Sequence, residues 1–547
     1  MSPQAQDVAR GLPDGLVEAF ADPRTFSGGG SPITGIETHI SHLALTEDRV
    51  YKLRKDVCFD FLDFSRREAR VRDCLDEVRL NRRLAPGVYL GVAPAERREG
   101  SFRIGAPIEP SAFDRVASDS DCEWVVVMRR LSPGRDAESL LERGALTEPQ
   151  IDALAHHLAA FHRAERLDAR PEEEVPDPAA AVRENLSSLR KLIGGEGADR
   201  CKRLARRVRA FESLHGKRLR ERLAEKRWVE GHGDLRLEHV WYEDRLHPEV
   251  IDCVEFSAAL RQIDAANDVA FLAMDLRFRG AHALAERFLA QYASAADDFG
   301  IFSVLRYYEA YRAAVRAKVS ALRQSQQAGG DASAASGGAR AMAYLELAVR
   351  ILDEGRRGLL IATTGCVGSG KSSLARELAR RLPAVVISSD IVRKHLSGDA
   401  PESPEPAGWG TGRYRLEERT RIYGLLLERA EHVLRSGRHV ILDASFAERA
   451  WRGGLASWAE ERDFAPWLIR ADCSDEVIHE RLVERRRIGR SASDAGPELL
   501  AASRRAYEEP SEWPACRRRC IDTGVQNWRE TAVAAVAADL RAAALAC

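Results

Sequence analysis

The sequence feature that most limits the possible folds of this chain is the segment GCVGSGKSS at residues 365–373, which matches the mononucleotide-binding P-loop. The apolar run LLIATT precedes it as an expected short strand, and SSLARELARRL follows it as an expected helix. In such a loop, glycines let the backbone wrap around phosphate oxygens, a lysine reaches the β- and γ-phosphates, and a serine hydroxyl ligates Mg²⁺. We therefore expect ATP or GTP with Mg²⁺, the metal held through Ser372 and the nucleotide bound by Gly365, Gly368, Ser369, Gly370, Lys371, Ser372 and Ser373.

Composition narrows the class of protein. The 547 residues carry 83 basic and 84 acidic side chains, so a net charge of -1 provides no basic field for nucleic acid or an anionic membrane. No stretch reaches the roughly 18 apolar residues of a spanning helix, and the N-terminus lacks the apolar core of a signal peptide. The ten cysteines form no CxxC pair and are expected to be reduced thiols. We expect a cytoplasmic protein.

The length suggests about three compact units, or two of which one is large. Residues 324–338 are polar and rich in Gly, Ala and Ser, which predicts a flexible segment between two helices at 306–323 and 339–355. We place a domain boundary near residue 355, with a lead-in at 1–32, a mixed α+β domain at 33–355 and an α/β P-loop domain at 356–547. The P-loop domain is expected to hold a parallel sheet flanked by helices.

Two acidic positions follow apolar strands in the P-loop domain. Asp390 comes after AVVISS, with Arg393 one helical turn later, and this pair could orient or deprotonate a substrate hydroxyl. Asp443 ends the run VILD, where it could hold Mg²⁺ through water or help activate the acceptor. The structural alternative for each aspartate is a helix N-cap at a strand-to-helix turn.

Downstream, EVIHERLVERRR places Arg481 and Arg485 four residues apart, on one face of an expected helix. Arginines there could form a lid that neutralises charge during phosphoryl transfer, with SASDA at 491–495 as its far side. The alternative is a solvated basic helix. These motifs together resemble the small P-loop kinases of the zeta-toxin and polynucleotide-kinase-like group, over residues 358–540.

A second constellation lies in the first half, in the segment GHGDLRLEHVWYEDRLHPEVIDCVEF. Asp234 precedes one short expected strand, and Asp252 ends the next. One carboxylate could accept the proton of an acceptor hydroxyl while the other holds Mg²⁺. Upstream, Lys52 lies in the strand RVYKL and could pair with nucleotide phosphates, and Glu77 in the following helix could fix it. Lys55 competes with Lys52 for this role.

This set resembles the aminoglycoside phosphotransferase family, which has a protein-kinase-like fold, over residues 33–322. Stretches such as VYKLRKDVCFDFLDFSRREAR and DVAFLAMDL resemble a subgroup in which this domain is fused to a P-loop kinase. The resemblance implies a bilobal kinase-like domain in which Asp234 is the catalytic base and Asp252 binds the metal. It also implies that Asp268 supports the catalytic loop.

The chain departs from that family's HGD-L-H-x-x-N pattern at two positions. Arg236 replaces the second histidine, and His239 stands where the metal-binding asparagine is expected. Imidazole can ligate a metal but prefers softer ions than Mg²⁺. His239 is therefore a candidate metal ligand, and whether it can bind the metal ion decides whether this lobe transfers phosphate.

We hypothesise a bifunctional ATP-dependent phosphotransferase, with transfer to a small-molecule hydroxyl in one or both domains. The alternative is a P-loop kinase or ATPase regulated by a nucleotide-binding pseudokinase-like N-terminal domain. A nucleotide-dependent switch is a third hypothesis. In each, the expected partners are nucleotide and a small molecule rather than nucleic acid or membrane, and the oligomeric state stays open.

Overall fold

The computed structural model describes residues 11–26, 32–59, 62–114, 122–168, 177, 179–326, 331–353, 357–397, 416–488 and 496–546. Its contacts divide the chain into two compact units, which we describe separately. The first unit comprises Met1–His157, Phe161–Leu167 and Trp228–Asp268. The second unit comprises Leu158–Ala160, Asp168–Arg227 and Val269–Cys547. SASDA and the expected boundary at 355 lie outside the described residues.

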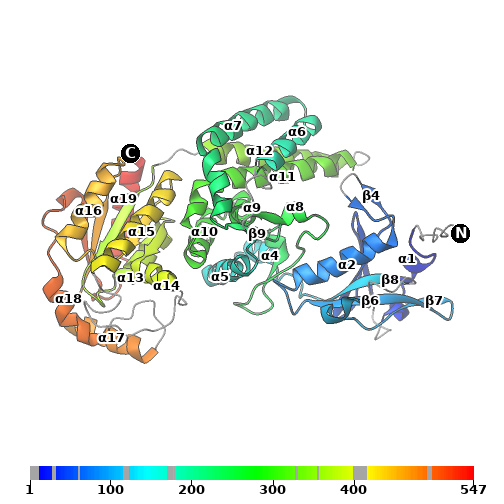
Figure 1. Cartoon of the computed structure of the whole chain (residues 1–547), viewed down its shortest axis with the longest axis horizontal. Coiled ribbons are helices and arrows are strands. Elements are labelled where there is room, and N and C mark those ends of the chain that lie inside the picture. The colour runs from blue at the N-terminus through cyan, green and yellow to red at the C-terminus, as the bar shows by residue number, and fades with distance from the viewer. Residues whose placement is uncertain are drawn as a thin grey trace. The chain divides into compact units, whose positions relative to one another are not determined.

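The first unit is built on a six-stranded antiparallel sheet (Figure 1). Its strands, in spatial order, are β1 (Thr34–Glu37), β2 (Ser41–Leu45), β3 (Arg49–Arg54), β8 (Glu123–Arg129), β6 (Tyr89–Arg98) and β7 (Ser101–Ile104). Strand β6 contains Gly91 and Pro94, residues that usually interrupt strands. The register shift between Tyr89 and Gly91 accommodates the glycine as an irregularity within the strand.

Alternation along β8 divides the core of this sheet between its two faces. Val125 and Val127 pack with Leu16 and Phe20 from the start of the chain, so the expected lead-in contributes to the core, through α1 (Leu16–Ala19). On the other face, Trp124 and Val126 pack against α2 (Arg67–Asn81). Lys52 is paired with Val126 in the β3–β8 register, which places it on the face that α2 covers.

The rest of the first unit holds the HGD segment. It lies between the antiparallel partners β9 (Trp228–Glu230) and β12 (Gln262–Asp264), and it contains the antiparallel pair β10 (Val240–Trp241) and β11 (Glu249–Val250). The second expected strand ends early, so Asp252 lies two residues beyond it with a φ of 63° in the left-handed region. The elements are α4 (Ala137–Glu142), α5 (Glu148–Ala164), β9 (Trp228–Glu230), η4 (Leu237–His239), β10 (Val240–Trp241), β11 (Glu249–Val250), α8 (Ala258–Arg261) and β12 (Gln262–Asp264).

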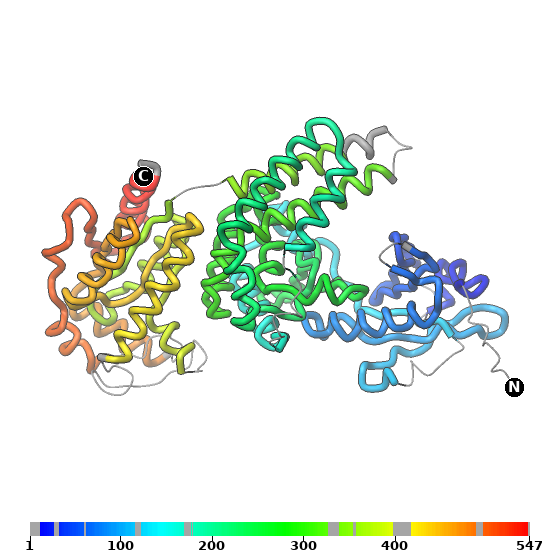
Figure 2. The backbone as a smooth tube through the Cα atoms, turned by 45° about the horizontal axis from the view of Figure 1, so that its top comes forward, coloured from blue at the N-terminus to red at the C-terminus, as the bar shows by residue number. Residues whose placement is uncertain are grey.

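Long helices form the first part of the second unit, and several of them pack side by side (Figures 1 and 2). Most of the segment expected to be flexible, at 324–338, is helical, because α11 continues to Gln326 and α12 begins at Asp331. Alanine favours helix, and α12 packs along α11. The helices are α6 (Ala180–Leu192), α7 (Gly195–Ala224), α9 (Ala265–Phe278, in this unit from Val269), α10 (His282–Ala296), η5 (Phe299–Ser303), α11 (Leu305–Gln326) and α12 (Asp331–Asp353).

The second unit also contains the expected parallel sheet, which has five strands. In spatial order these are β14 (Val385–Ser388), β15 (Val440–Asp443), β13 (Leu360–Thr364), β16 (Trp467–Asp472) and β17 (Arg518–Asp522). Strands β13 and β15 are buried along their whole length, as expected for a parallel sheet covered on both faces.

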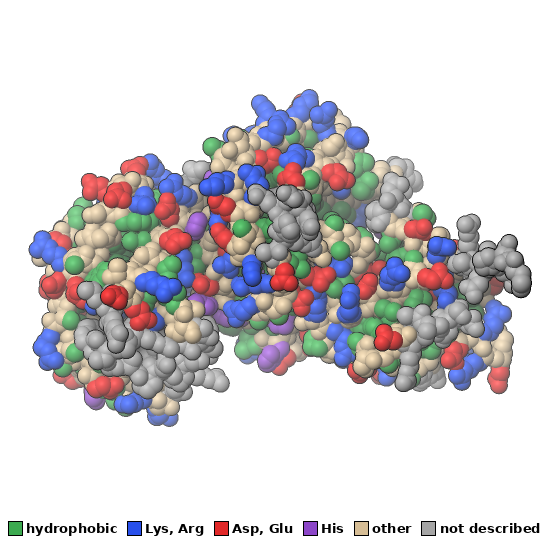
Figure 3. Space-filling view, viewed as in Figure 1, with side chains coloured by type: hydrophobic (Ala, Val, Ile, Leu, Met, Phe, Trp, Pro, Cys, Tyr) green, Lys and Arg blue, Asp and Glu red, His purple; other side chains and the backbone are tan. Residues whose placement is uncertain are grey.

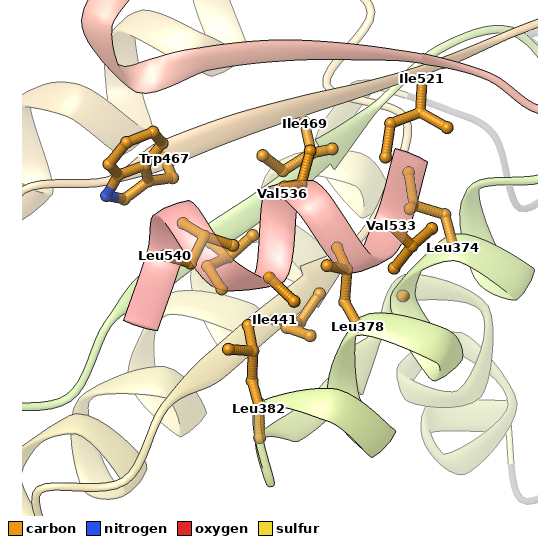
Figure 4. Close-up of a cluster of buried hydrophobic side chains, with 14 of the residues drawn as sticks. Leu374, Leu378, Leu382, Ile441, Trp467, Ile469, Ile521, Val533, Val536 and Leu540 are labelled. Atoms are coloured by element: carbon orange, nitrogen blue, oxygen red, sulfur yellow. The ribbon is translucent and has the colours of Figure 1, made fainter. Parts of the chain in front are cut away.

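Helices flank this sheet. On one face, α13 (Lys371–Arg381) and α19 (Ala532–Ala546) pack their leucines and valines on Ile441, Ile469 and Ile521 (Figure 4). Helix α15 (Leu416–Arg435) contacts β14 and β15. The remaining helices are α14 (Ser389–Ser397), α16 (Arg449–Glu460), α17 (Asp475–Ile488) and α18 (Leu500–Ala506). The predicted fold class is confirmed for both domains.

The surface agrees with the balanced composition. Basic and acidic side chains are interspersed over the face shown in Figure 3. The basic run on α7 is amphipathic, since Cys201, Leu204 and Val208 are buried while Lys202, Arg203 and their basic neighbours are exposed. Within the described residues, no helix is long and apolar enough to cross a membrane.

Candidate active sites

The P-loop forms a tight cradle between β13 and α13. Gly365, Gly368 and Gly370 all have positive φ values, of 143°, 73° and 90°. A Cβ atom on Gly365 would lie 2.3 Å from the carbonyl oxygen of Ala471, so a side chain there would clash with backbone. These glycines are therefore required by the geometry of the loop.

Two polar groups in this cradle suit a phosphate ligand. Lys371 Nζ donates to the carbonyl oxygen of Cys366 at 2.6 Å, and burial lowers the pKa of this lysine. Ser369 Oγ is buried and has no hydrogen-bond partner within the described residues. A bound phosphate would offer acceptors to both groups and offset the cost of burying them.

Ser372 and Asp443 come together at the end of the sheet. The Ser372 hydroxyl hydrogen-bonds the Asp443 carboxylate, whose pKa is raised by burial and by the nearby charge of Asp390. The nearest described helix after Asp443 begins at Arg449, so Asp443 caps no helix and the N-cap alternative does not hold for it. Two neighbouring carboxylates and a hydroxyl are the oxygen donors that Mg²⁺ prefers, so this site fits a magnesium ion.

Asp390 and Arg393 form an ion pair in the first turns of α14, with Arg393 Nη1 2.9 Å from Asp390 Oδ1. Asp390 lies inside the helix rather than at its N-cap, since α14 begins at Ser389. Its side chain is 24% exposed while that of Arg393 is 10% exposed. The arginine can therefore hold a carboxylate that still reaches solvent or a substrate.

The structure separates the two arginines of α17. Burial lowers the pKa of Arg485, and the charge of Asp390 opposes this shift, so Arg485 belongs with the acidic site. Arg481 instead donates to Thr523, at 3.0 Å to Oγ1 and 2.6 Å to the carbonyl oxygen. Thr523 Oγ1 in turn donates to the carbonyl oxygen of Ser369 at 2.7 Å, so Arg481 supports the P-loop from behind.

Sequence reasoning missed Thr523 and Arg376. Thr523 follows β17 in the short run DTG, which carries no specific motif, and only the pairing of β16 with β17 brings it to the P-loop. Arg376 lies one turn into α13, where its charge acts on Asp443 and Arg485. Its spacing of four residues from Ser372 was a usable signal, because residues four apart on a helix lie on the same face.

In the first unit, Lys52 pairs with Glu77. Lys52 Nζ lies 2.8 Å from Glu77 Oε1, and the Lys52 side chain is 12% exposed. Lys55 instead pairs with the exposed Glu37. The structure thus brings together the expected pair, Lys52 and Glu77, rather than Lys55 and Glu77.

A buried guanidinium that the sequence did not reveal shares this pair. Arg54 contacts Asp73, Glu77 and Glu255 at 2.5, 2.6 and 2.7 Å, and its side chain is 1% exposed. Burial raises the pKa of Glu255 to about 8. The network joins α2 to the segment after Asp252, so it fixes Glu77 from two sides.

Asp268 organises the HGD loop, as the family resemblance implied. Its carboxylate accepts hydrogen bonds from the backbone of His232 at 2.7 Å and of Gly233 at 3.0 Å. His162 Nε2 lies 3.1 Å from Oδ2 of the same carboxylate. A Cβ on Gly231 would come 2.7 Å from this carboxylate, which explains the glycine.

Asp234 and Asp252 face a compact set of side chains. Arg236 binds the Asp234 carboxylate through Nε at 3.0 Å and Nη2 at 2.7 Å. His239 Nε2 lies 3.4 Å from Asp252 Oδ2 and 3.0 Å from Arg236 Nη2. Burial alone would raise the pKa of Asp252, but His239 and Lys52 together lower it.

This arrangement does not fit the expected metal pair. His239 already contacts Arg236, and no group of three or more His, Cys, Asp or Glu within the described part of the chain is arranged to hold a metal. Asp252 keeps a 53% exposed carboxylate. Of the two expected ligands, His239 is the one that the geometry argues against.

Comparisons with known proteins identify one matching family model and several similar structures. Residues 360–510 match the family model of an AAA domain, AAA_33. In solved structures, a gluconokinase from Sinorhizobium meliloti 1021 covers 34% of this chain and 98% of its own, at 21% identity and a TM-score of 0.24. A choline/ethanolamine kinase family protein from Mesorhizobium loti covers 62% of this chain and 99% of its own, at 13% identity and a TM-score of 0.35.

Full-length relatives also exist. The uncharacterized protein Rv2004c of Mycobacterium tuberculosis is 35% identical over 474 residues, which cover 85% of this chain and 88% of the relative. The uncharacterized protein Mb2027c of Mycobacterium bovis matches with the same values. The chain therefore belongs to the family of these mycobacterial proteins.

Proposed function

We propose that this protein is an ATP-dependent phosphotransferase whose P-loop domain transfers the γ-phosphoryl group to a hydroxyl of a small molecule. The observation that carries this proposal is the convergence of Lys371, Ser372, Asp390 and Asp443 at one end of the parallel sheet. A nucleotide-dependent switch would need only Lys371 and Ser372. The Asp390–Arg393 pair adds a carboxylate that is suited to an acceptor.

Each residue then has a role. Lys371 and the P-loop amides bind the phosphates, and Asp443 with Ser372 would hold Mg²⁺, which neutralises charge on the β- and γ-phosphates when bound. Asp390 accepts the proton of the acceptor hydroxyl. The acceptor oxygen bonds to the γ-phosphorus, and the bond from that phosphorus to the bridging oxygen of ADP breaks. Arg485 lies close enough to Asp390 to neutralise charge that develops at the phosphoryl group.

For the N-terminal site, defined by Lys52, Glu77, Asp234, His239 and Asp252, we propose nucleotide binding. The Lys52–Glu77 pair favours it, because a fixed lysine is suited to nucleotide phosphates. Phosphoryl transfer with Asp234 as base is the second candidate, favoured by the position of Asp268 under the loop. In this site the chain's resemblance to aminoglycoside phosphotransferases describes ancestry rather than substrate.

The test is transfer of label from γ-labelled ATP, with Mg²⁺, to a panel of sugars, nucleosides, aminoglycosides and extract metabolites. Wild type is compared with Lys371→Ala, Asp390→Asn and Asp234→Asn. We expect products that require Lys371 and Asp390 but survive loss of Asp234. Products lost only in Asp234→Asn would instead assign the chemistry to the N-terminal site. ATP hydrolysis that no acceptor changes and that Asp390→Asn leaves intact would support a switch and contradict the proposal.

A further inference from the structure

One edge strand of the parallel sheet contacts helices that come earlier in the chain. The strand order places β14 at an edge of the sheet, next to β15. Helix α10 contacts β14, and η5 contacts α15. Both α10 and η5 belong to the same compact unit as the sheet. An edge strand pairs with another strand on one side alone, so the element that packs against it contributes to its position.

A buried group of four charged side chains joins these helices to the sheet. Arg438 donates through Nε to Glu286 Oε2 of α10 at 2.8 Å, and its Nη2 lies 3.6 Å from Glu309 Oε2 of α11. Arg277 of α9 contacts the same two carboxylates. The side chains of Arg438 and Glu309 are 9% and 1% exposed. Charged groups this far from water are stable only while they are paired, so the contact belongs to the folded state.

Helix α14 is joined to the same helices. His395 Nε2 lies 2.9 Å from the carbonyl oxygen of Ser294, near the end of α10. A carbonyl can only accept a hydrogen bond, so this ring nitrogen carries the proton and donates it. On α15, His432 Nδ1 lies 2.8 Å from Ser303 Oγ, the last residue of η5. We call α10 together with η5 the docking surface.

The docking surface contacts both segments that carry the acidic residues of the P-loop site. Asp390 lies in α14, five residues before His395. Asp443 ends β15, which begins two residues after Arg438. In the register of the two strands, Ser388 at the end of β14 is paired with Asp443. The separation of the two carboxylates therefore depends on how β14 and α14 lie against β15.

The P-loop is held in a different way. The Thr523 hydroxyl donates to the carbonyl oxygen of Ser369 at 2.7 Å, and the backbone N–H of Val367 donates to Ser503 Oγ at 3.0 Å. Both partners come from the C-terminal part of the P-loop domain itself. A change at the docking surface should therefore affect the acidic residues more than the phosphate cradle.

We propose that the docking surface positions the acceptor side of the P-loop site, so that phosphoryl transfer there depends on helices outside the P-loop domain. This inference rests on the transfer proposed above for that site. His395 and Arg438 are positioning residues, because they act on Asp390 and Asp443 through α14 and β15. Glu286 and Ser294 are their partners on the docking surface.

Hydrogen exchange of the full chain, followed by mass spectrometry, tests the surface from its far side. Glu286→Gln changes α10 and removes the carboxylate charge nearest to the buried Arg438. We expect the protection of residues 385–397 to fall by about tenfold or more, because a buried charge loses its partner. His395→Ala removes one hydrogen bond and should lower the same protection by about fivefold. Residues 371–381 of α13 should keep their protection in both variants.

Glu346→Gln makes the same chemical change on a 56% exposed side chain of α12 and is the matched control, which should leave protection unchanged. Unchanged protection of residues 385–397 in both Glu286→Gln and His395→Ala would overturn the proposal. A fall of equal size in α13 and in residues 385–397 would mean general loosening of the domain and would overturn it too.

Transfer activity measures the effect on chemistry. For the labelled product that wild type forms with the panel above, we expect Glu286→Gln to lower kcat by about tenfold, as misplaced reacting groups do. The ATP-binding event that Lys371→Ala removes should keep its dissociation constant within about twofold. Unchanged kcat despite lower protection of residues 385–397 would overturn the positioning role. A wild type that forms no labelled product would instead overturn the proposed function, and the exchange result, which needs no acceptor, separates the two failures.

Discussion

Replacing Arg54 by methionine tests the buried charge network of the first unit. Methionine keeps much of the volume of the side chain but removes the guanidinium that contacts Asp73, Glu77 and Glu255. The network then holds three carboxylates and one cation, Lys52, in a region closed to water. We expect this single change to destabilise α2 strongly and to disturb the position of Glu77.

The size of the effect follows from burial. The Arg54 side chain is 1% exposed, and those of Asp73, Glu77 and Glu255 are 6%, 1% and 7% exposed. Removing one partner from such a buried pair costs about 3–5 kcal/mol, because the remaining charge is left uncompensated. Glu255, whose pKa is raised to about 8, already carries a proton near neutral pH, so fewer charges are left uncompensated and we expect the lower end of that range.

Hydrogen exchange of peptides from α2, followed by mass spectrometry, measures the free energy of opening in the first unit. We expect the protection of α2 to fall by about two orders of magnitude, since each 1.4 kcal/mol is a factor of ten. Arg79→Met, on the same helix but with a 64% exposed side chain, is the control and should leave protection unchanged. Equal protection in Arg54→Met and Arg79→Met would refute the reasoning.

Three further predictions follow from the geometry. Burial raises the pKa of Glu255 to about 8, so the folded state binds a proton that the unfolded state has already released at lower pH. The stability that this proton contributes is therefore lost as pH rises through about 8. Glu255→Gln should flatten the dependence of stability on pH in unfolding scans. A wild-type midpoint that falls no more steeply than that of the variant between about pH 6 and 8 would contradict it. Gly365→Ala places a Cβ 2.3 Å from the Ala471 carbonyl oxygen and should abolish ATP binding at the P-loop, which calorimetry detects as the binding event that Lys371→Ala also removes. Retained binding in this variant would contradict the prediction and show that the loop can shift. Asp268→Asn replaces a fully buried acceptor of two backbone hydrogen bonds and should lower the protection of the HGD loop in hydrogen exchange by about 1–3 kcal/mol, whereas unchanged protection would deny it a supporting role.

The P-loop site was largely predictable because its information is local. Residues 365–373 are contiguous, and one strand and one helix position them. Asp390 and Asp443 were identifiable because parallel strands end at the same edge of a sheet, so residues that follow them converge. In the first unit, alternation in β3 favoured Lys52 over Lys55 for the same local reason.

The sequence alone therefore determined the nucleotide-binding loop, the two-domain order and the residues that follow the strands. Only the tertiary structure decided which charges meet. Arg54 and Glu255 are 201 positions apart, and Thr523 lies 154 positions from the serine it supports. The contact of Arg236 with His239 also depends on how the HGD loop folds around Asp268. Packing determines which buried charges pair with each other, because desolvation makes an unpaired buried charge too costly. These pairings leave no periodic signal in the sequence.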